Sequence, residues 1–199
     1  MIKSDDSDRR ALQREAKLAE IVRAAWSLSR ADGLSGISLR SLANRVGLRQ
    51  PSLYAYFDSK LALYDAMFAD GCRQLLEFIA DLQPTDDPKQ DLIEFVARIV
   101  EFSSADIERH QLLFQRTLPG FEPSPASYEV AIEFYSRGTA LLHAAGVTRA
   151  EDVDLFTALS AGLTHQQVAN DPGGDRWVKQ SPRVVEMFLT EVRRAQEST

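Results

Sequence analysis

The sequence contains only one cysteine, Cys72, and no apolar run of the roughly 18 residues that span a bilayer. A single cysteine excludes a disulfide within the chain and favours a reducing compartment, so we expect a cytoplasmic protein. The first eight residues have no apolar core, and no secretory signal is expected there. These absences argue against the disulfide-rich secreted and membrane-spanning classes, and we expect no membrane partner.

Motifs for catalysis and metal binding are also missing. There is no Gly-x-Ser-x-Gly elbow and no Walker loop. The histidines, His110, His143 and His165, lie far apart, and no pair has the i, i+4 spacing of a helical zinc site. We therefore expect no enzymatic activity and no bound cofactor or metal.

The net charge of −6 is unevenly distributed along the 199 residues. Residues 1–60 hold 11 basic and 7 acidic side chains, a balance of +4, whereas residues 61–199 hold 12 and 22, a balance of −10. A basic end on an acidic protein suggests that this end alone meets an anion.

Strand signals are nearly absent, and apolar residues recur at helical spacing in about nine segments. Three come first, over residues 18–32, 38–46 and 51–57. Behind them we expect helices over 59–82, 88–99, 127–145, 148–170 and 181–195, with a less regular stretch through 110–114. The pattern predicts an all-α fold, in which a three-helix domain precedes a bundle of roughly six helices. We expect a disordered tail over residues 1–10, the three-helix domain over 11–58 and the larger domain over 59–199.

Residues 38–57 have the spacing of a helix-turn-helix. Ser38 is placed to cap the first helix, Gly47 suits the turn, and Pro51 suits the first turn of the second helix. In such a unit the second helix enters the major groove of DNA and contacts base edges near its start. This segment therefore predicts contact with duplex DNA.

The start of that second helix carries side chains suited to DNA. Arg49 can donate two hydrogen bonds to guanine and Gln50 can bond adenine, with Ser52 close by. Tyr54 and Tyr56 place hydroxyls on rigid rings, which suits them to phosphate oxygens. These five residues are the candidates for base and backbone contacts.

Lys60 is a further candidate because of its position. A cation in the first turn of a helix opposes the helix dipole, typically by about 0.3–1 kcal/mol. A DNA phosphate bound there would satisfy both the lysine and the helix N–H groups. A solvated surface lysine is the alternative interpretation.

Short segments over residues 21–25, 38–43, 46–48, 51–54 and 56–60, with Gly33 and Leu63, form one ordered set across about a quarter of the chain. This set resembles the DNA-binding domain of the TetR family of bacterial transcriptional regulators. Members of that family often have histidine where this chain has Tyr56, and tyrosine keeps a hydrogen-bonding ring there.

The resemblance implies a homodimer that binds a two-fold symmetric operator. It implies base contacts from Arg49, Gln50 and Ser52. It also implies phosphate contacts from Tyr54, Tyr56 and Lys60. It adds backbone contacts at the start of the preceding helix, from Ser38, Arg40 and Ser41. It also implies that the remaining helices form a ligand-binding and dimerisation domain, whose last two long helices make the dimer contact.

The larger domain is rich in aromatic residues, since 13 of the 17 follow residue 60. A helical bundle of this kind can leave an apolar cavity with few polar groups. Our candidate ligand contacts combine such aromatics with polar residues on otherwise apolar segments: Phe68, Phe102, Phe114, Arg116, Phe134, His165 and Trp177. Core packing is the alternative for each aromatic, and a structural or surface role for each polar residue.

We therefore expect a ligand-responsive DNA-binding transcriptional regulator, a repressor released from a palindromic operator by a small apolar or amphipathic effector. One alternative is a small-molecule carrier or helical enzyme without specific DNA binding. Another is a non-specific DNA-coating protein. The charge split and the Arg49–Gln50 pair argue against the first, and the modest balance of +4 argues against the second.

Overall fold

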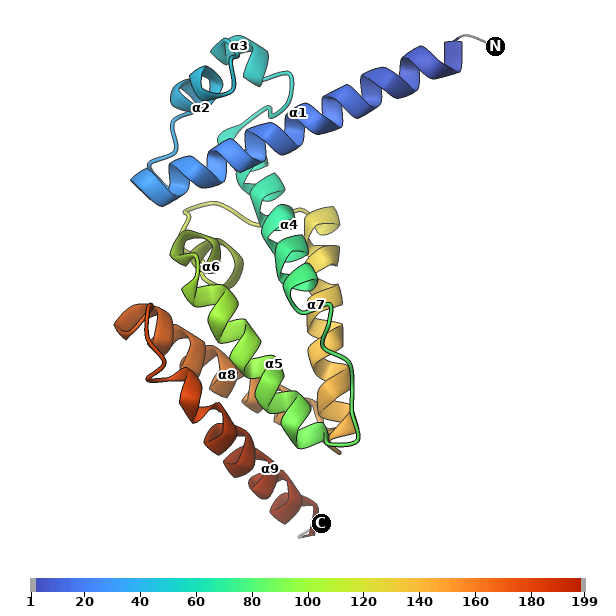
Figure 1. The fold of residues 1–199 in the computed structure, drawn as a ribbon, viewed down its shortest axis with the longest axis vertical. Helices are drawn as coiled ribbons and strands as arrows, with labels where there is room; N and C mark the ends of the chain where they lie inside the picture. The colour runs from blue at the N-terminus through green and yellow to red at the C-terminus, as the bar shows by residue number, and fades with distance from the viewer. Residues whose placement is uncertain (1–2, 198–199) are drawn as a thin grey trace.

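The computed structural model describes residues 3–197, with side chains from residue 8 onward. This range contains nine α-helices, one short 3-10 helix and no strand: α1 (Lys3–Asp32), α2 (Leu39–Arg45), α3 (Gln50–Leu53), α4 (Lys60–Phe78), α5 (Pro88–Ser104), α6 (Ile107–Phe114), α7 (Pro125–Ala144), α8 (Ala150–Asn170), η1 (Val178–Gln180) and α9 (Ser181–Glu197). Helices α1–α3 stand at one end of an elongated molecule, and α4–α9 form the bundle below them (Figure 1). The predicted all-α fold, with three helices leading and six following, is confirmed.

The first helix is much longer than its apolar stripe. The stripe occupies the second half of α1, whereas the first half projects beyond α2 and α3 (Figure 1). The structure differs here from the predicted disordered tail over residues 1–10. Residues 3–10 form the first turns of α1, and residues 1–2 lie outside the described range. No proline or glycine interrupts residues 3–32, and good helix formers such as Arg10, Ala11 and Leu12 carry the helix outward.

Local signals place α2 and α3 where the sequence predicts them. The Ser38 hydroxyl accepts a hydrogen bond from the Ser41 N–H at 3.4 Å and caps α2. Gly47 has φ +69°, a left-handed conformation that side chains with a Cβ rarely adopt, and it turns the chain toward α3. Pro51 lies in the first turn of α3, where its missing N–H costs no hydrogen bond.

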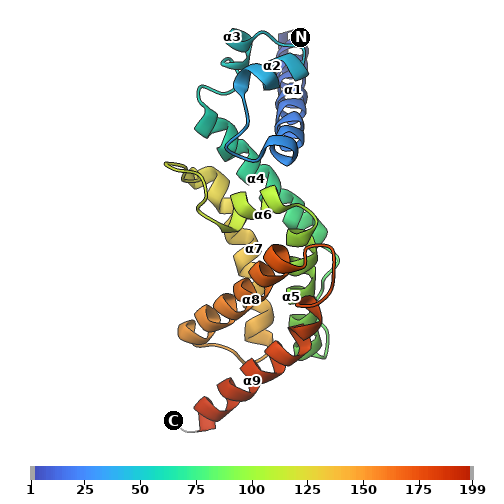
Figure 2. The same ribbon diagram turned by 90° about the vertical axis from the view of Figure 1, so that its left-hand side faces the viewer.

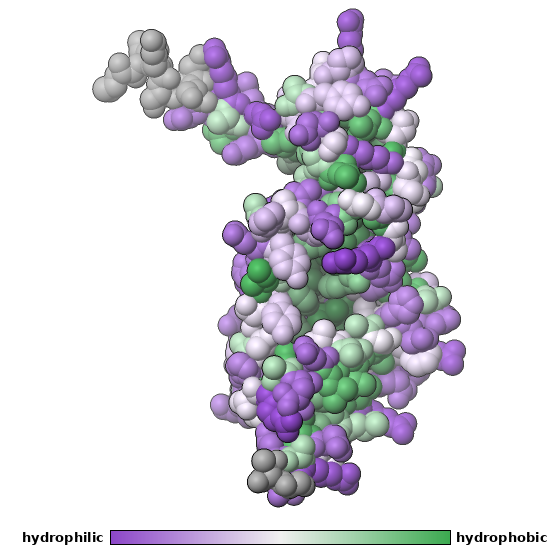
Figure 3. Space-filling view, turned by 180° about the vertical axis from the view of Figure 1, so that it is seen from behind, coloured by the Kyte–Doolittle hydropathy of each residue, from purple (hydrophilic) through white to green (hydrophobic). Residues whose placement is uncertain are grey.

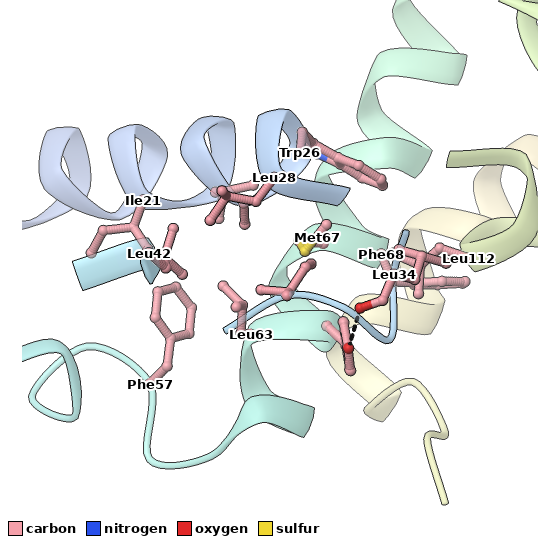
Figure 4. Close-up of a cluster of buried hydrophobic side chains, with 14 of the residues drawn as sticks. Ile21, Trp26, Leu28, Leu34, Leu42, Phe57, Leu63, Met67, Phe68 and Leu112 are labelled. Carbon is pink, nitrogen blue, oxygen red and sulfur yellow. Dashed lines mark hydrogen bonds between the residues drawn. The ribbon is translucent and has the colours of Figure 1, made fainter. Parts of the chain in front are cut away.

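A shared hydrophobic core holds these helices against the start of α4 (Figure 4). Ile21, Leu42, Leu63 and Met67 are fully buried in it, and each contributes about 1.5–3 kcal/mol of burial free energy. The Tyr64 hydroxyl donates to the Leu34 carbonyl at 2.6 Å, drawn as a dashed line in Figure 4. This core crosses the boundary expected after residue 58, so the division at that position remains a prediction.

A second core fills the bundle, with α5 packed against α8 and α9 and with α4 beside α7 (Figures 1 and 2). Leu92, Val96, Val147 and Val185 are fully buried there. No helix within residues 3–197 is long and apolar enough to cross a membrane. The bundle thus arranges α5, α6, α7 and α8 around a cavity.

Candidate nucleic-acid interface and ligand cavity

The predicted base-reading edge lies on the surface of the front module. Arg49 has an extended backbone just before α3, and its side chain makes no capping bond. Arg49, Gln50 and Ser52 are all exposed, while Leu53 is buried and anchors α3 to the core. The short helix therefore turns its polar side chains to solvent because its single buried residue fixes the opposite face.

The two tyrosines flank this edge. Tyr54 is 47% exposed at the end of α3, and Tyr56 is half-buried. The Arg14 guanidinium from α1 lies 5.7 Å from the centre of the Tyr56 ring and donates to the Ala55 carbonyl at 3.3 Å. Arg14 is a basic residue beside the predicted interface that the sequence reasoning did not single out. Arg14 lies three residues before Lys17, so the two basic side chains are neighbours on the helix surface. This pair was the signal that the sequence offered.

Lys60 occupies the first turn of α4, as predicted. Ser59 caps this helix, because its hydroxyl accepts from the Ala62 N–H at 3.0 Å. The Lys60 ammonium donates to the Ser35 carbonyl at 2.8 Å and lies 5.6 Å from the Tyr64 ring centre. The lysine is thus held at the helix start, and its contact with a phosphate stays a prediction.

The start of α2 presents the remaining predicted backbone contacts. Ser38, Arg40 and Ser41 are exposed. The Ser38 hydroxyl already accepts the capping bond, so its remaining lone pair and its O–H are what it offers to a partner. These residues lie at the surface, and their contact with DNA also stays a prediction.

A cavity of about 240 Å³ opens between α5, α6, α7 and α8. From behind, the molecule shows a hydrophobic hollow near its middle (Figure 3). Of the predicted ligand contacts, three line this cavity: Phe114, Phe134 and His165.

Two further predicted aromatic contacts, Phe68 and Phe102, do not line this cavity. Phe68 packs in the front core, 6.4 Å from the Phe121 ring centre. Phe102 packs against Phe78 at 5.6 Å, and the Arg109 guanidinium covers its face at 3.5 Å. Both rings belong to packed cores. Composition alone does not distinguish a core ring from a ring that lines a cavity.

Arg116 and Trp177 also lie outside the cavity. Arg116 is almost fully exposed in the loop after α6 and pairs with Glu122 at 3.8 Å. Trp177 lies in the turn before α9, where its backbone N–H donates to the Gln167 side chain at 2.8 Å. Arg116 is thus a surface residue and Trp177 a turn residue, and neither lines the cavity.

Two polar residues of the cavity wall, His110 and Gln115, were missed. His110 is only 4% exposed, and burial, with a smaller effect from His165, lowers its pKa to about 4. The Gln115 amide nitrogen lies 3.2 Å from Nε2 of His110 and 3.0 Å from Nδ1 of His165. Gln115 and His165 lie 50 residues apart, so no local signal in the sequence would join them.

Helix α6 connects the cavity to the front module. Asp106 caps α6 by accepting from the Arg109 N–H at 3.1 Å. The same carboxylate accepts from Nε and Nη2 of Arg30 at 2.9 and 2.6 Å, and Arg30 lies in the last turn of α1. One short helix thus carries cavity residues at its far end and an ion pair to α1 at its start.

The remaining reactive groups do not form a second site. Cys72 is buried in the front core, and burial raises the pKa of its thiol to about 12. Over the part of the chain that the structure describes, no three histidine, cysteine or acidic side chains gather in a metal-binding arrangement.

Comparison with known proteins agrees with this architecture. Residues 21–67 match the family model described as bacterial regulatory proteins, tetR family. The tetracycline repressor protein class C of Escherichia coli is 45% identical over 56 residues, which make up 28% of this chain and 24% of the repressor. The transcriptional activator FasR of Mycolicibacterium smegmatis is 27% identical over 123 residues, 61% of this chain and 56% of FasR. The matches thus span about a quarter and about half of these relatives' lengths.

The whole fold also has a solved counterpart. The transcriptional regulator FadR from Bacillus subtilis, determined in complex with stearoyl-CoA, superposes with a TM-score of 0.67 at 14% identity. The superposition covers 86% of this chain and 97% of FadR, and at this identity it shows a shared fold. Residues 21–67 thus match the tetR family of bacterial regulatory proteins, and the whole chain shares the fold of a transcriptional regulator.

Proposed function

We propose that this protein is a ligand-responsive transcriptional repressor that binds a palindromic operator as a homodimer. The observation that carries the proposal is the exposed edge of Arg49, Gln50 and Ser52 on a helix-turn-helix whose core is fully packed. A helix anchored on one face only by Leu53 leaves these side chains available to a major groove.

Each residue of the edge has a distinct role in this proposal. Arg49 donates twice to guanine O6 and N7, and Gln50 pairs with adenine. Tyr54, Tyr56 and Lys60 contact phosphates at the groove walls, and the start of α2 adds backbone contacts. The base contacts select the sequence, whereas the phosphate contacts add affinity that falls with salt.

The exposed apolar face of α8 supports a homodimer through the last two long helices. Leu155 and Leu159 are 45% and 39% exposed, and Met187 on α9 is 62% exposed. Ala158 and Gly162 lie exposed on the same helix and would let a partner helix approach closely. Pairing α8 and α9 with a second copy would cover this apolar surface, and an obligate dimer buries roughly 2,000 Å² or more.

Ligand binding would act on DNA binding through α6. A ligand in the cavity contacts the end of α6, and the Arg30–Asp106 ion pair passes any displacement of that helix to α1. Two helix-turn-helix domains of a dimer, set about 34–36 Å apart, fit successive major grooves. A ligand that binds more tightly to a dimer with a different spacing of the DNA-binding domains lowers the affinity for the operator. The size of the effect is set by the difference between the ligand's affinities for the two spacings.

Selection from a pool of random duplexes tests the DNA-reading role. We expect a palindrome with two half-sites one helical turn apart, and we expect Arg49→Ala to return a consensus that is degenerate at one position per half-site. Recovery of no sequence preference would contradict the proposal. A reporter gene behind the selected palindrome tests the direction of control, and activation instead of repression would contradict the repressor role.

The cavity also favours a second candidate, a small-molecule carrier or helical enzyme in which the front helices only pack the bundle. Tight binding of a metabolite without enrichment of any DNA sequence would support that candidate. The regulator is preferred because the carrier leaves the exposed Arg49–Gln50 edge without a role. A cytoplasmic location belongs to the same proposal, because a bacterial regulator acts where the DNA lies.

A further inference from the structure

We propose that the cavity between α5, α6, α7 and α8 takes an uncharged, single-ring aromatic compound that carries one hydrogen-bonding oxygen. The inference rests on the ligand-binding role proposed above and adds the chemical class of the effector. Four properties of the cavity wall carry it: charge, polar groups, shape and size.

The wall has no permanent charge. No lysine, arginine, aspartate or glutamate lines the cavity. The ionisable side chains on it are His110, His165 and Tyr135. Burial lowers the pKa of His110 to about 4, so this ring is neutral at pH 7. A charged ligand would lose its hydration without gaining an ionic partner, which disfavours anions and cations alike.

The polar groups gather where α6 meets α8. The Gln115 amide nitrogen bridges the two histidines at 3.2 and 3.0 Å, and with the amide in this orientation it donates to both rings. Nε2 of His110 then accepts, and its proton lies on Nδ1. Nδ1 is buried without a hydrogen-bond partner, and so is the hydroxyl of Ser160 on α8.

Both groups lack a hydrogen-bond partner, and a ligand oxygen would supply one. His110 and Ser160 both line the cavity, from α6 and α8. A buried donor without a partner carries the full cost of its desolvation, which an acceptor on the ligand would remove. A carbonyl or hydroxyl oxygen meets this need, whereas a pure hydrocarbon does not.

The rest of the wall is aromatic and suits a flat ring. Phe95 and Phe134 stack at 5.7 Å with 19° between their planes, and Phe114 meets Phe134 edge-on at 6.4 Å. Gly138 allows this arrangement, since a Cβ there would lie 3.0 Å from the Phe95 ring. Offset-stacked and edge-on contacts of this kind favour a planar aromatic guest over a flexible chain.

The volume suits a guest built on one aromatic ring. A dry apolar cavity of about 150 Å³ accepts benzene. The 240 Å³ found here leaves room for a ring and a few substituent atoms.

Four probes of known structure test the class by isothermal titration calorimetry on the full chain, without DNA, at pH 7.5. Acetophenone and ethylbenzene share a ring and differ by one oxygen, benzoate adds a charge, and decanoate replaces the ring with a chain. We expect acetophenone to bind about tenfold more tightly than ethylbenzene, with benzoate and decanoate weaker than both. Equal affinity for acetophenone and ethylbenzene, or tighter binding of benzoate or decanoate, overturns the inference.

Two serine variants locate the oxygen contact. Ser160→Ala removes the orphan hydroxyl of the cavity wall, and we expect it to reduce the preference for acetophenone over ethylbenzene several-fold. Ser103→Ala is the matched control, because Ser103 also has a buried hydroxyl without a partner but does not line the cavity. An unchanged preference in Ser160→Ala, or an equal loss in Ser103→Ala, contradicts the assignment.

The outcome separates this inference from the proposed function. A protein that selects a palindrome but prefers benzoate or decanoate retains its regulatory role and loses this ligand class. A protein that binds acetophenone as expected but selects no DNA sequence retains the ligand class and loses the regulatory role.

Discussion

The front module and the rear bundle use their polar residues in opposite ways. In the front module, the candidate functional side chains point outward from a core whose polar groups are paired, as Tyr64 and Trp26 illustrate with bonds to the Leu34 carbonyl and to Asp70. In the rear bundle, the candidate functional groups point inward, and His110 Nδ1 and Ser160 Oγ lie buried without a partner.

The difference reflects the partners proposed for each part. DNA is large and highly charged, so a rigid surface with exposed donors suits it. A small apolar ligand needs a water-excluding space with few polar groups, and such a space leaves some of them unpaired until the ligand binds. Changes confined to one part should therefore affect one binding activity.

The largest expected effect comes from removing the anchor of α3. Leu53→Ala deletes the one buried side chain of that helix, and we expect a loss of about 2–5 kcal/mol in the unfolding free energy. Operator binding should be abolished while acetophenone binding persists. Leu92→Ala in the rear core is the matched control, and it should weaken acetophenone binding while operator binding persists. Urea titrations, gel shifts and calorimetry give the three readouts, and loss of both activities in Leu53→Ala would erase the contrast between the parts.

The next effect is a pH dependence that belongs to the rear bundle. His110 has a folded pKa of about 4 against about 6.5 unfolded, so the unfolded chain takes up a proton first as the pH falls. The stability present above pH 6.5 should therefore decline by up to about 3 kcal/mol between pH 6.5 and 4. Urea titrations across this range should show a smaller decline for His110→Gln. The same pH slope in both proteins would show that other groups carry it.

A moderate effect is expected from Arg49→Ala. Loss of a bidentate guanine contact should cost about 1–3 kcal/mol at the preferred operator and relax base preference at one position per half-site. Arg73→Ala, an exposed arginine in the middle of α4, is the control and should bind the operator like the unaltered protein. Competition gel shifts with single-base operator variants measure the effect. Unchanged discrimination at every position would remove Arg49 from the base-reading edge.

The smallest effect is expected from Lys60→Ala. This change should weaken binding to all duplexes about equally and lower the slope of log affinity against log salt by about 1 for each head. Lys89→Ala provides a close match, because Lys89 also lies in the first turn of a helix but in the rear bundle, where it pairs with Glu186. Titrations at several salt concentrations decide the point. An unchanged slope for Lys60→Ala would leave the lysine with its contacts to the Ser35 carbonyl and the Tyr64 ring alone.

The front module could be predicted closely because its signals are local. The Ser38 cap, the turn at Gly47 and the first-turn Pro51 each act within a few residues, and the structure contains all three. The outward position of Arg49 and Gln50 follows from the same short spacing. The length of α1 was missed because a charged, exposed helix shows no apolar periodicity.

The cavity could be predicted only in part. Phe114, Phe134 and His165 were among the candidates, but Phe68 and Phe102 have the same chemistry and lie in packed cores. Helix α6 lies over the stretch that looked irregular in the sequence, and it carries His110. The contact between Gln115 and His165 spans 50 residues, so no local sequence pattern could predict it.

The sequence by itself determined the helical class, the helix-turn-helix and the surface edge of Arg49 and Gln50, because caps, glycine turns and apolar periodicity act over one or two helical turns. Tertiary structure alone decided which aromatic rings enclose a cavity, which polar atoms stay unpaired and how Asp106 reaches Arg30. The physical reason is that a cavity is the space left when helices distant in the chain pack together, and its volume and lining depend on all of them at once.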